Sequence, residues 1–142
     1  MNLNTDFVDK LRNSGLRPTR QRLKICEVLF SPEKTFHFTI NDLTKIIEEK
    51  LSEKISLATV YNTVHAFKDK GYLKEISINS DKSYFDTNTS NHHHFFDEDT
   101  NELIDCSIDD IDSVNVKQNI TGKKIKSIEV LIKVATDNQN QK

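Results

Sequence analysis

The segment from Ser56 to Gly71 constrains the fold most, because it has the start, the periodicity and the end of one amphipathic helix. Ser56 is a favourable N-cap residue, and Gly71 suits the position just beyond a helix, where the backbone turns left-handed. Apolar residues recur at helical spacing and define the side expected to face a core: Val60, Val64 and Phe67. We therefore expect one helix here that packs against the rest of the fold along a single side.

The outer side of this helix has an unusual composition. A surface helix normally carries long charged side chains, whereas here short polar and aromatic residues follow the N-cap, namely Thr59, Tyr61, Asn62 and His65. Hydroxyl, phenol and amide groups are suited to contacts with bases and phosphates. This side of the helix therefore indicates a surface for nucleic acid. The alternative is a generic domain whose capped helix is merely exposed.

Three further helices are expected before this one, and two strands after it. The helices run from about Asp6 to Arg12, from Thr19 to Phe30, and from Thr39 to Leu51, with Thr19 and Thr39 in N-cap positions. The strands, at residues 72–78 and 82–85, are joined by a polar turn. Two helices with a short turn between them, followed by a β-hairpin, form the pattern of a winged helix-turn-helix. The fold class expected is α+β.

Charge is distributed unevenly along the chain. Residues 1–75 hold 13 basic and 10 acidic residues, a net charge of +3, whereas residues 76–142 hold 7 and 12, a net charge of −5. Six basic residues and no acidic one lie between Lys10 and Lys24. The first part therefore suits a polyanion and the second suits cations. The basic stretch favours nucleic-acid binding over the generic domain.

The length of 142 residues allows two small domains, which we expect at residues 1–86 and 87–142. In the second domain the sequence predicts three strands, one helix and a disordered tail. The strands run from the histidines to Phe96, from Asn101 to Cys106 and from Ile125 to Val134; the helix runs from Ile108 to about Val116, and the tail begins near Thr136. The last strand either pairs with another copy of the chain or is buried within the monomer.

Composition argues against several classes of protein. The chain has no run of 18 apolar residues, and its first residues lack the basic start and apolar stretch of a secretory signal. A cytoplasmic protein without a membrane span is expected. Cys26 and Cys106 lie 80 positions apart and no CxxC occurs, which argues against a cysteine-based zinc site and a disulfide framework. Cys26 is expected to be a small core residue.

Three consecutive histidines, His92 to His94, concentrate imidazole nitrogens in one small volume. Such nitrogens can bind a metal ion or haem iron. In an extended segment His92 and His94 point to one side and His93 to the other. His92 and His94 could therefore share a metal ion, whereas His93 would serve another site. The alternative is a polar surface strand or turn.

Several motifs in the same order resemble the ferric uptake regulator (Fur) family. They are Gly15–Arg22 (GLRPTRQR), Leu57–Thr63 (LATVYNT), Tyr84–Asn88 (YFDTN) and the histidine triplet. The likeness extends from about Leu11 to Val134, and the ATVYN run with the triplet is most similar to the iron response regulator (Irr) branch. The resemblance implies a homodimeric transcription regulator with an N-terminal winged helix and a C-terminal dimerisation domain.

The resemblance also implies how DNA is bound. Members bind pseudo-palindromic operators, and each protomer places its fourth helix in the major groove. By position, Tyr61 is expected to contact bases, and Arg17 corresponds to a lysine that reaches DNA in relatives. The complete set expected to contact DNA is Arg17, Thr19, Arg20, Arg22, Thr59, Tyr61 and Asn62.

The metal ligands of the family correspond to this chain only in part. The resemblance implies a nitrogen- and oxygen-rich site that links the two domains and suits Mn²⁺, Fe²⁺ or Zn²⁺. Its residues are His37, Asp86, His92, His94 and Asp105. Many relatives hold a structural zinc with a CxxC pair, but residues 97–100 here contain no cysteine. We therefore expect no four-cysteine zinc site.

Two kinds of effector follow from these matches. In the Irr branch haem is proposed to bind the triplet and weaken DNA binding, which would make His92, His93 and His94 haem ligands. The alternative is a regulator that depends on Mn²⁺ or Fe²⁺ at the domain hinge. A metal hydrolase is disfavoured, because neighbouring strand histidines cannot all face one ion and no HExxH, nucleophile elbow or glycine-rich phosphate loop occurs. We therefore expect a regulator rather than an enzyme.

Overall fold

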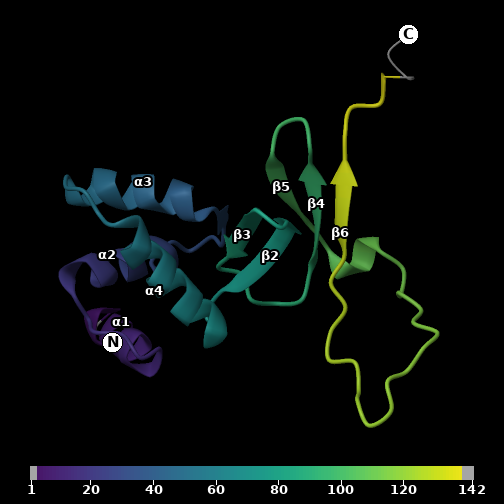
Figure 1. The fold of residues 1–142 in the computed structure, drawn as a ribbon, viewed down its shortest axis with the longest axis horizontal. Coiled ribbons are helices and arrows are strands. Elements are labelled where there is room, and N and C mark those ends of the chain that lie inside the picture. Colours follow the sequence, from purple (N-terminus) through teal and green to yellow (C-terminus); the bar gives the residue numbers. More distant parts are fainter. Residues whose placement is uncertain (1–2, 139–142) are drawn as a thin grey trace. The chain divides into compact units, whose positions relative to one another are not determined.

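A computed structural model describes residues 3–138 and forms two compact units, one ending at Thr89 and the other beginning at Ser90. The first unit contains the four expected helices (Figure 1). They are α1 (Leu3–Asn13), α2 (Arg20–Phe30), α3 (Ile40–Leu51) and α4 (Leu57–Asp69). The expected α+β fold class is confirmed.

Local capping explains where three of these helices begin. The side chains of Thr19, Thr39 and Ser56 each accept a hydrogen bond from the backbone N–H three residues later. These bonds satisfy donors that have no partner within the helix. Gly71 follows α4 with a φ of +83°, in the left-handed region that favours glycine. The predicted caps are confirmed.

The sheet of the first unit is antiparallel and has the strand order β1-β3-β2. Strands β2 (Lys74–Asn79) and β3 (Lys82–Asp86) form the expected hairpin. Strand β1 (His37–Phe38) was not expected, because two residues are too short to show an alternating pattern. It pairs with the end of β3, so that His37 lies opposite Asp86.

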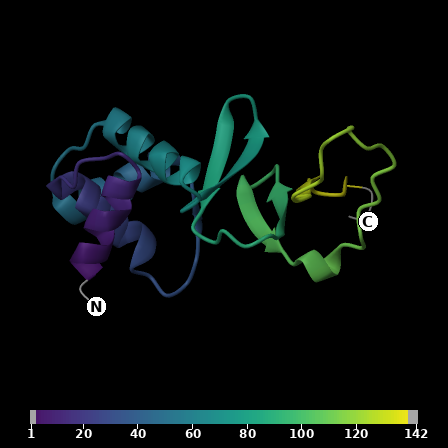
Figure 2. The same cartoon turned by 90° about the horizontal axis from the view of Figure 1, so that it is seen from below.

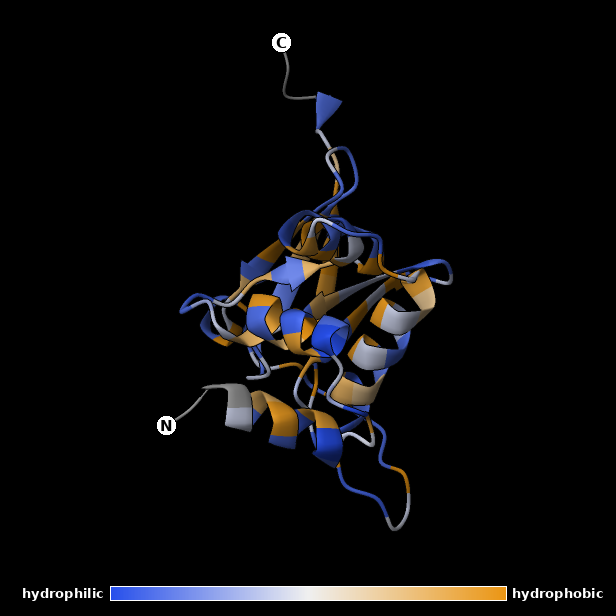
Figure 3. Ribbon diagram, turned by 90° about the vertical axis from the view of Figure 1, so that its left-hand side faces the viewer, coloured by the Kyte–Doolittle hydropathy of each residue, from blue (hydrophilic) through white to orange (hydrophobic). Residues whose placement is uncertain are grey.

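The core of the first unit lies among the four helices, and Phe38 of β1 and Phe85 of β3 add to it. Val60, Val64 and Phe67 are fully buried, which confirms the inner side predicted for α4. Cys26 is also fully buried, as expected of a small core residue. Coloured by hydropathy, the helices carry apolar and polar stretches in turn, as amphipathic helices do (Figure 3).

The second unit contains a mixed sheet with the strand order β5-β4-β6. Strand β4 (His93–Asp97) pairs antiparallel with β5 (Glu102–Cys106) and parallel with β6 (Leu131–Val134). Strand β6 therefore pairs within the monomer along one edge, but it lies at the end of the sheet and is only partly buried, so pairing of its other edge with a second copy stays a prediction. It is shorter than the strand predicted from Ile125, and the residues before Leu131 form no regular strand.

The predicted helix from Ile108 to Val116 is wrong. Only a short 3-10 turn, η1 (Ile108–Asp110), forms there, and an irregular segment leads from it to β6 (Figure 2). The reason is local, since the Ser107 hydroxyl accepts a hydrogen bond from the Asp109 N–H and caps a tight turn. Aspartate, serine and asparagine follow, and such side chains compete with the backbone bonds of a helix.

The polar tail was expected to be disordered from about Thr136. Thr136 itself is held by Asp99, whose Oδ2 accepts hydrogen bonds from the Thr136 backbone N–H at 2.6 Å and from its hydroxyl at 2.5 Å. Residues 139–142 lie outside the described part of the chain. Among the residues described, no helix combines the length and the apolar character needed to cross a membrane.

Candidate functional site

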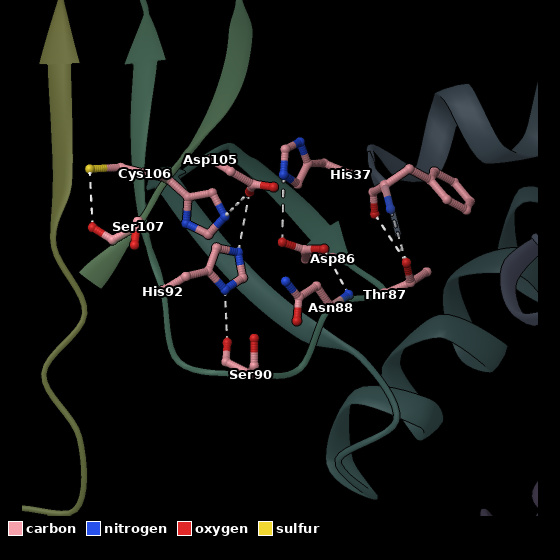
Figure 4. Close-up of polar contacts among 11 residues, drawn as sticks. His37, Asp86, Thr87, Asn88, Ser90, His92, Asp105, Cys106 and Ser107 are labelled. Carbon is pink, nitrogen blue, oxygen red and sulfur yellow. Dashed lines mark hydrogen bonds and ion pairs between the residues drawn. The ribbon is translucent and has the colours of Figure 1, made fainter. Parts of the chain in front are cut away.

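The pairing of β4 with β5 brings two histidines of the triplet to one carboxylate. His94 and Asp105 are register partners across the two strands. The Nε2 atoms of His92 and His94 lie 3.2 Å and 3.3 Å from the same oxygen, Oδ1 of Asp105 (Figure 4). The two imidazole rings are 4.4 Å apart between centroids. Three donor atoms of the types that bind divalent metals therefore converge within the second unit.

The backbone at Ser90 fixes the orientation of the His92 ring. Its carbonyl oxygen lies 2.8 Å from Nδ1 of His92, and a carbonyl can only accept, so Nδ1 carries a proton. In a neutral ring Nε2 then directs a lone pair toward the Asp105 carboxylate. Two electron-rich atoms at this distance need a proton or a cation between them. An Nδ1–H bond to a carbonyl is also the usual support of a metal-binding histidine.

The distances from Asp105 to the two imidazoles fit a shared ion. Two ligand atoms that each lie about 2.1 Å from one ion are about 3.0 to 3.4 Å apart in tetrahedral or octahedral geometry. The distances from Asp105 Oδ1 to the two Nε2 atoms fall in this interval. His92 and His94 are buried, whereas Asp105 is exposed. A cation could therefore reach the group from the side of the carboxylate.

His93 takes no part in this group. Its Nδ1 accepts a hydrogen bond of 2.9 Å from the Val130 N–H, just before β6. Because neighbouring residues on a strand point to opposite sides, the separation of His93 from His92 and His94 agrees with the expected alternation. The His93 ring is buried and joins β4 to the chain that leads into β6.

The first unit contains an imidazole–carboxylate pair of its own. Nε2 of His37 on β1 lies 3.5 Å from Oδ2 of Asp86 on β3. The other carboxylate oxygen, Oδ1, accepts a hydrogen bond of 2.8 Å from the Asn88 N–H. Asp86 is almost completely buried, and a buried carboxylate is stable only when such partners compensate it. The five predicted metal ligands thus form one group in each unit, and their union at a single ion stays a prediction.

The residues predicted to contact DNA on α4 differ in exposure. The Tyr61 side chain is 51% exposed, and Asn62 is exposed beside it. Thr59 is half-buried, and its backbone N–H is bonded by the Ser56 cap. Tyr61 and Asn62 are therefore placed to contact a partner directly, whereas Thr59 has a structural task at the start of the helix.

Several basic residues before and within α2 make contacts within the protein. The Arg20 guanidinium forms an ion pair with Glu53, in the turn before α4. Arg22 donates from Nη1 to the Arg17 carbonyl at 3.3 Å, and its Nε is buried without a hydrogen-bond partner among the residues described. Thr19 serves as the N-cap. Arg17 is exposed, so its side chain can reach a phosphate. All these DNA contacts remain predictions.

The sequence did not predict two groups that contact the expected site residues. Glu53 lies 33 positions from Arg20, and nothing in the local sequence signals their contact. The carbonyl group that orients His92 belongs to the backbone of Ser90, which no side-chain pattern can reveal.

The chain is similar to known proteins in both sequence and fold. Residues 13–134 match the ferric uptake regulator family. The chain is 34% identical over 117 residues to the peroxide-responsive repressor PerR of Staphylococcus epidermidis, covering 82% of this chain and 76% of that protein. It is 37% identical over 111 residues to the ferric uptake regulation protein of Yersinia pestis, covering 78% and 74%. The crystal structure of Vibrio cholerae Fur matches with a TM-score of 0.67 and 26% identity, covering 91% and 98%.

The winged-helix fold and these relatives define a class, the metal-responsive transcription regulators. Within that class, the chain belongs to the ferric uptake regulator family. The family resemblance of its motifs is thereby confirmed. The relatives named here are a peroxide-responsive repressor and ferric uptake regulators, so they do not support the narrower likeness to the iron response regulator branch.

Proposed function

We propose that this protein binds operator DNA as a homodimer and that a divalent metal ion, Mn²⁺ or Fe²⁺, changes its affinity for that DNA. One observation carries the proposal, namely the convergence of the His92 and His94 Nε2 atoms on Asp105. The proton on Nδ1 of His92 leaves its Nε2 available as a ligand. A bound cation would lie between these electron-rich atoms and neutralise the carboxylate.

Three protein donors leave the coordination of Mn²⁺ or Fe²⁺ incomplete, because these ions commonly take more nitrogen and oxygen ligands. The His37–Asp86 pair is proposed to supply further donors, since it offers the same kinds of atoms. A ligand set drawn from both units would make metal binding and DNA binding depend on one another. Couplings of this kind typically change affinity by about 5- to 150-fold.

The second unit supports dimerisation through its exposed apolar residues. In this unit they include Ile104, Ile108, Val114, Val116, Ile120 and Ile125. Covering them in a second copy of the chain would remove apolar surface from water. Two copies would also present two α4 helices, as a pseudo-palindromic operator requires.

The geometry favours a metal ion over haem at the triplet. His93 is bonded to Val130, and His92 and His94 project to the same side of the strand. Both rings would approach a bound group from the same side, so this pair would suit one small cation shared with Asp105 rather than a haem. Haem as effector, and with it the iron response regulator branch, remains a prediction without a supporting contact.

Metal titration of chelator-treated protein tests the proposal. Asp105→Asn is expected to lower Mn²⁺ affinity by more than about tenfold, because it removes a charged ligand at the centre of the group. Asp109→Asn is the matched control, since it makes the same substitution at an exposed carboxylate of the same unit. Mn²⁺ binding should be followed by calorimetry and by electron paramagnetic resonance.

Operator binding should be measured on the same samples with and without Mn²⁺, Fe²⁺ or hemin. At a metal concentration that just saturates the wild type, the proposal predicts that metal changes the operator affinity of the wild type and of Asp109→Asn much more than that of Asp105→Asn. Operator affinity of the wild type that is the same with and without either metal would contradict it. A hemin response that disappears when His92, His93 and His94 are all replaced by alanine would favour haem instead.

A further inference from the structure

A chain of aromatic rings in the first unit connects the core to Tyr61. Phe38 stacks on Phe85 with ring centroids 5.9 Å apart, and Phe85 meets the His65 ring edge to face at 5.3 Å. His65 in turn lies 4.1 Å from the ring of Tyr61, at an angle of 34°. The chain begins in the buried core and ends at a side chain that is about half exposed. Its members come from β1, β3 and α4.

The spacing along α4 explains the outer contact of this chain. Tyr61 and His65 are four residues apart, so their side chains lie on the same side of the helix. His65 is half-buried, and its ring rests on Phe85, which is itself buried. The Tyr61 ring therefore leans on a neighbour that the core supports. A half-exposed tyrosine without such a neighbour would exchange between rotamers.

We propose that His65 is a positioning residue that holds the Tyr61 phenol in the direction needed to contact a base, and so contributes to the choice of operator sequence. This inference rests on the proposed binding of DNA by α4. His65 itself need not touch a base. Its effect comes from preorganisation, because a side chain already held in its bound direction loses less freedom on binding. Non-specific binding depends on phosphate contacts instead and should not need this support.

Two kinds of substitution test whether the aromatic ring of His65, rather than its polar nitrogens, supports Tyr61. His65→Ala and His65→Gln remove the ring, whereas His65→Phe keeps a ring that can contact both Tyr61 and Phe85. Loss of one aromatic contact is expected to lower operator affinity by about two- to tenfold in the first two variants. Affinity for a random duplex should stay unchanged. His65→Phe should behave like the wild type, which a merely polar role of His65 would not allow.

The measurement uses the full chain and a duplex selected from a random library by the wild-type protein. Each variant is also made in a Tyr61→Ala background, where His65→Ala should have no additional effect on operator affinity. In DNA-free protein, the ring ¹H–¹³C signals of Tyr61 should shift in the alanine and glutamine variants. They should stay close to the wild-type positions in His65→Phe. Asp69→Ala, near the exposed end of α4, is the control for an alanine substitution in this helix.

The possible outcomes are distinct. Equal losses on operator and random DNA, or a full additional loss in the Tyr61→Ala background, would overturn the positioning role. Tyr61 signals that do not respond to removal of the ring would overturn it too, without any DNA in the sample. A wild-type protein that enriches no sequence from the library would refute the proposed function itself, before any variant is compared.

Discussion

Replacing Glu53 by glutamine should strengthen DNA binding, because Glu53 competes with phosphate for Arg20. The two side chains form an ion pair, yet they are 68% and 40% exposed. An exposed pair of this kind is worth about 0.2 to 1 kcal/mol. The ion pair must break before Arg20 binds a phosphate, so its free energy reduces the free energy gained on DNA binding. Glu53→Gln should therefore raise affinity by about 1.4- to 5-fold.

The salt dependence of binding gives a second measure of the same contact. If Arg20 gains a phosphate contact, the slope of log affinity against log salt should become steeper by up to about 0.9. The assay is fluorescence anisotropy with an operator duplex and a random duplex across a series of salt concentrations. Both duplexes should respond alike, since phosphate contacts do not distinguish sequences.

Two variants serve as controls for Glu53→Gln. Glu49→Gln changes the net charge by the same amount at an exposed position of α3. It should have a smaller effect, because Arg20 does not pair with that residue. Arg20→Ala should weaken binding to both duplexes and make the salt slope shallower by about one. If Glu53→Gln raises affinity equally in the Arg20→Ala background, general charge rather than release of Arg20 is the cause, and the reasoning fails.

Three further predictions concern stability and thiol chemistry. Ser56→Ala should lower the free energy of unfolding by about 1 kcal/mol, because it removes the cap on the Thr59 N–H. Urea denaturation measures this change, and an unchanged midpoint would mean that the cap contributes nothing. Phe67→Ala should cost about 3 to 5 kcal/mol in the same assay, since the ring is fully buried, and a loss below about 1 kcal/mol would contradict the packing. Burial raises the pKa of the Cys26 thiol to about 12, so iodoacetamide at pH 8 should label it only after unfolding. The unfolded thiol ionises near pH 8.5 while the folded one keeps its proton, so stability should fall as pH rises from about 8.5 to 12, and Cys26→Ala should lose this part of the pH dependence.

Features specified by neighbouring residues could be predicted from the sequence. The caps at Thr39 and Ser56 depend on one side chain and a backbone group three residues away, so the starts of these two helices were predicted well. The first helix has no such predicted cap, and it begins at Leu3 rather than near Asp6. Strand β1 and the ion pair of Arg20 with Glu53 depend on segments distant in sequence. The helix predicted after Ile108 was wrong because its apolar spacing was weighed above its many short polar side chains.

The candidate site likewise combines features that the sequence predicts with features that it does not. Strand alternation alone placed His92 and His94 on one side and His93 on the other. The position of Asp105 against them depends on the register of β4 and β5, which periodicity does not fix. The Ser90 carbonyl, which decides the proton position on His92, has no signature in the sequence.

The parallel pairing of β4 with β6 has a consequence for biosynthesis. Residue 94 is paired with residue 131, so the sheet around the imidazoles closes only after a long, irregular stretch of chain has emerged. Parallel pairs between distant segments form slowly. The helical unit, by contrast, has its own core and includes no residue beyond Thr89. During translation the helices can thus be complete while the later sheet is still open, which makes the sheet around the three histidines the last part to mature.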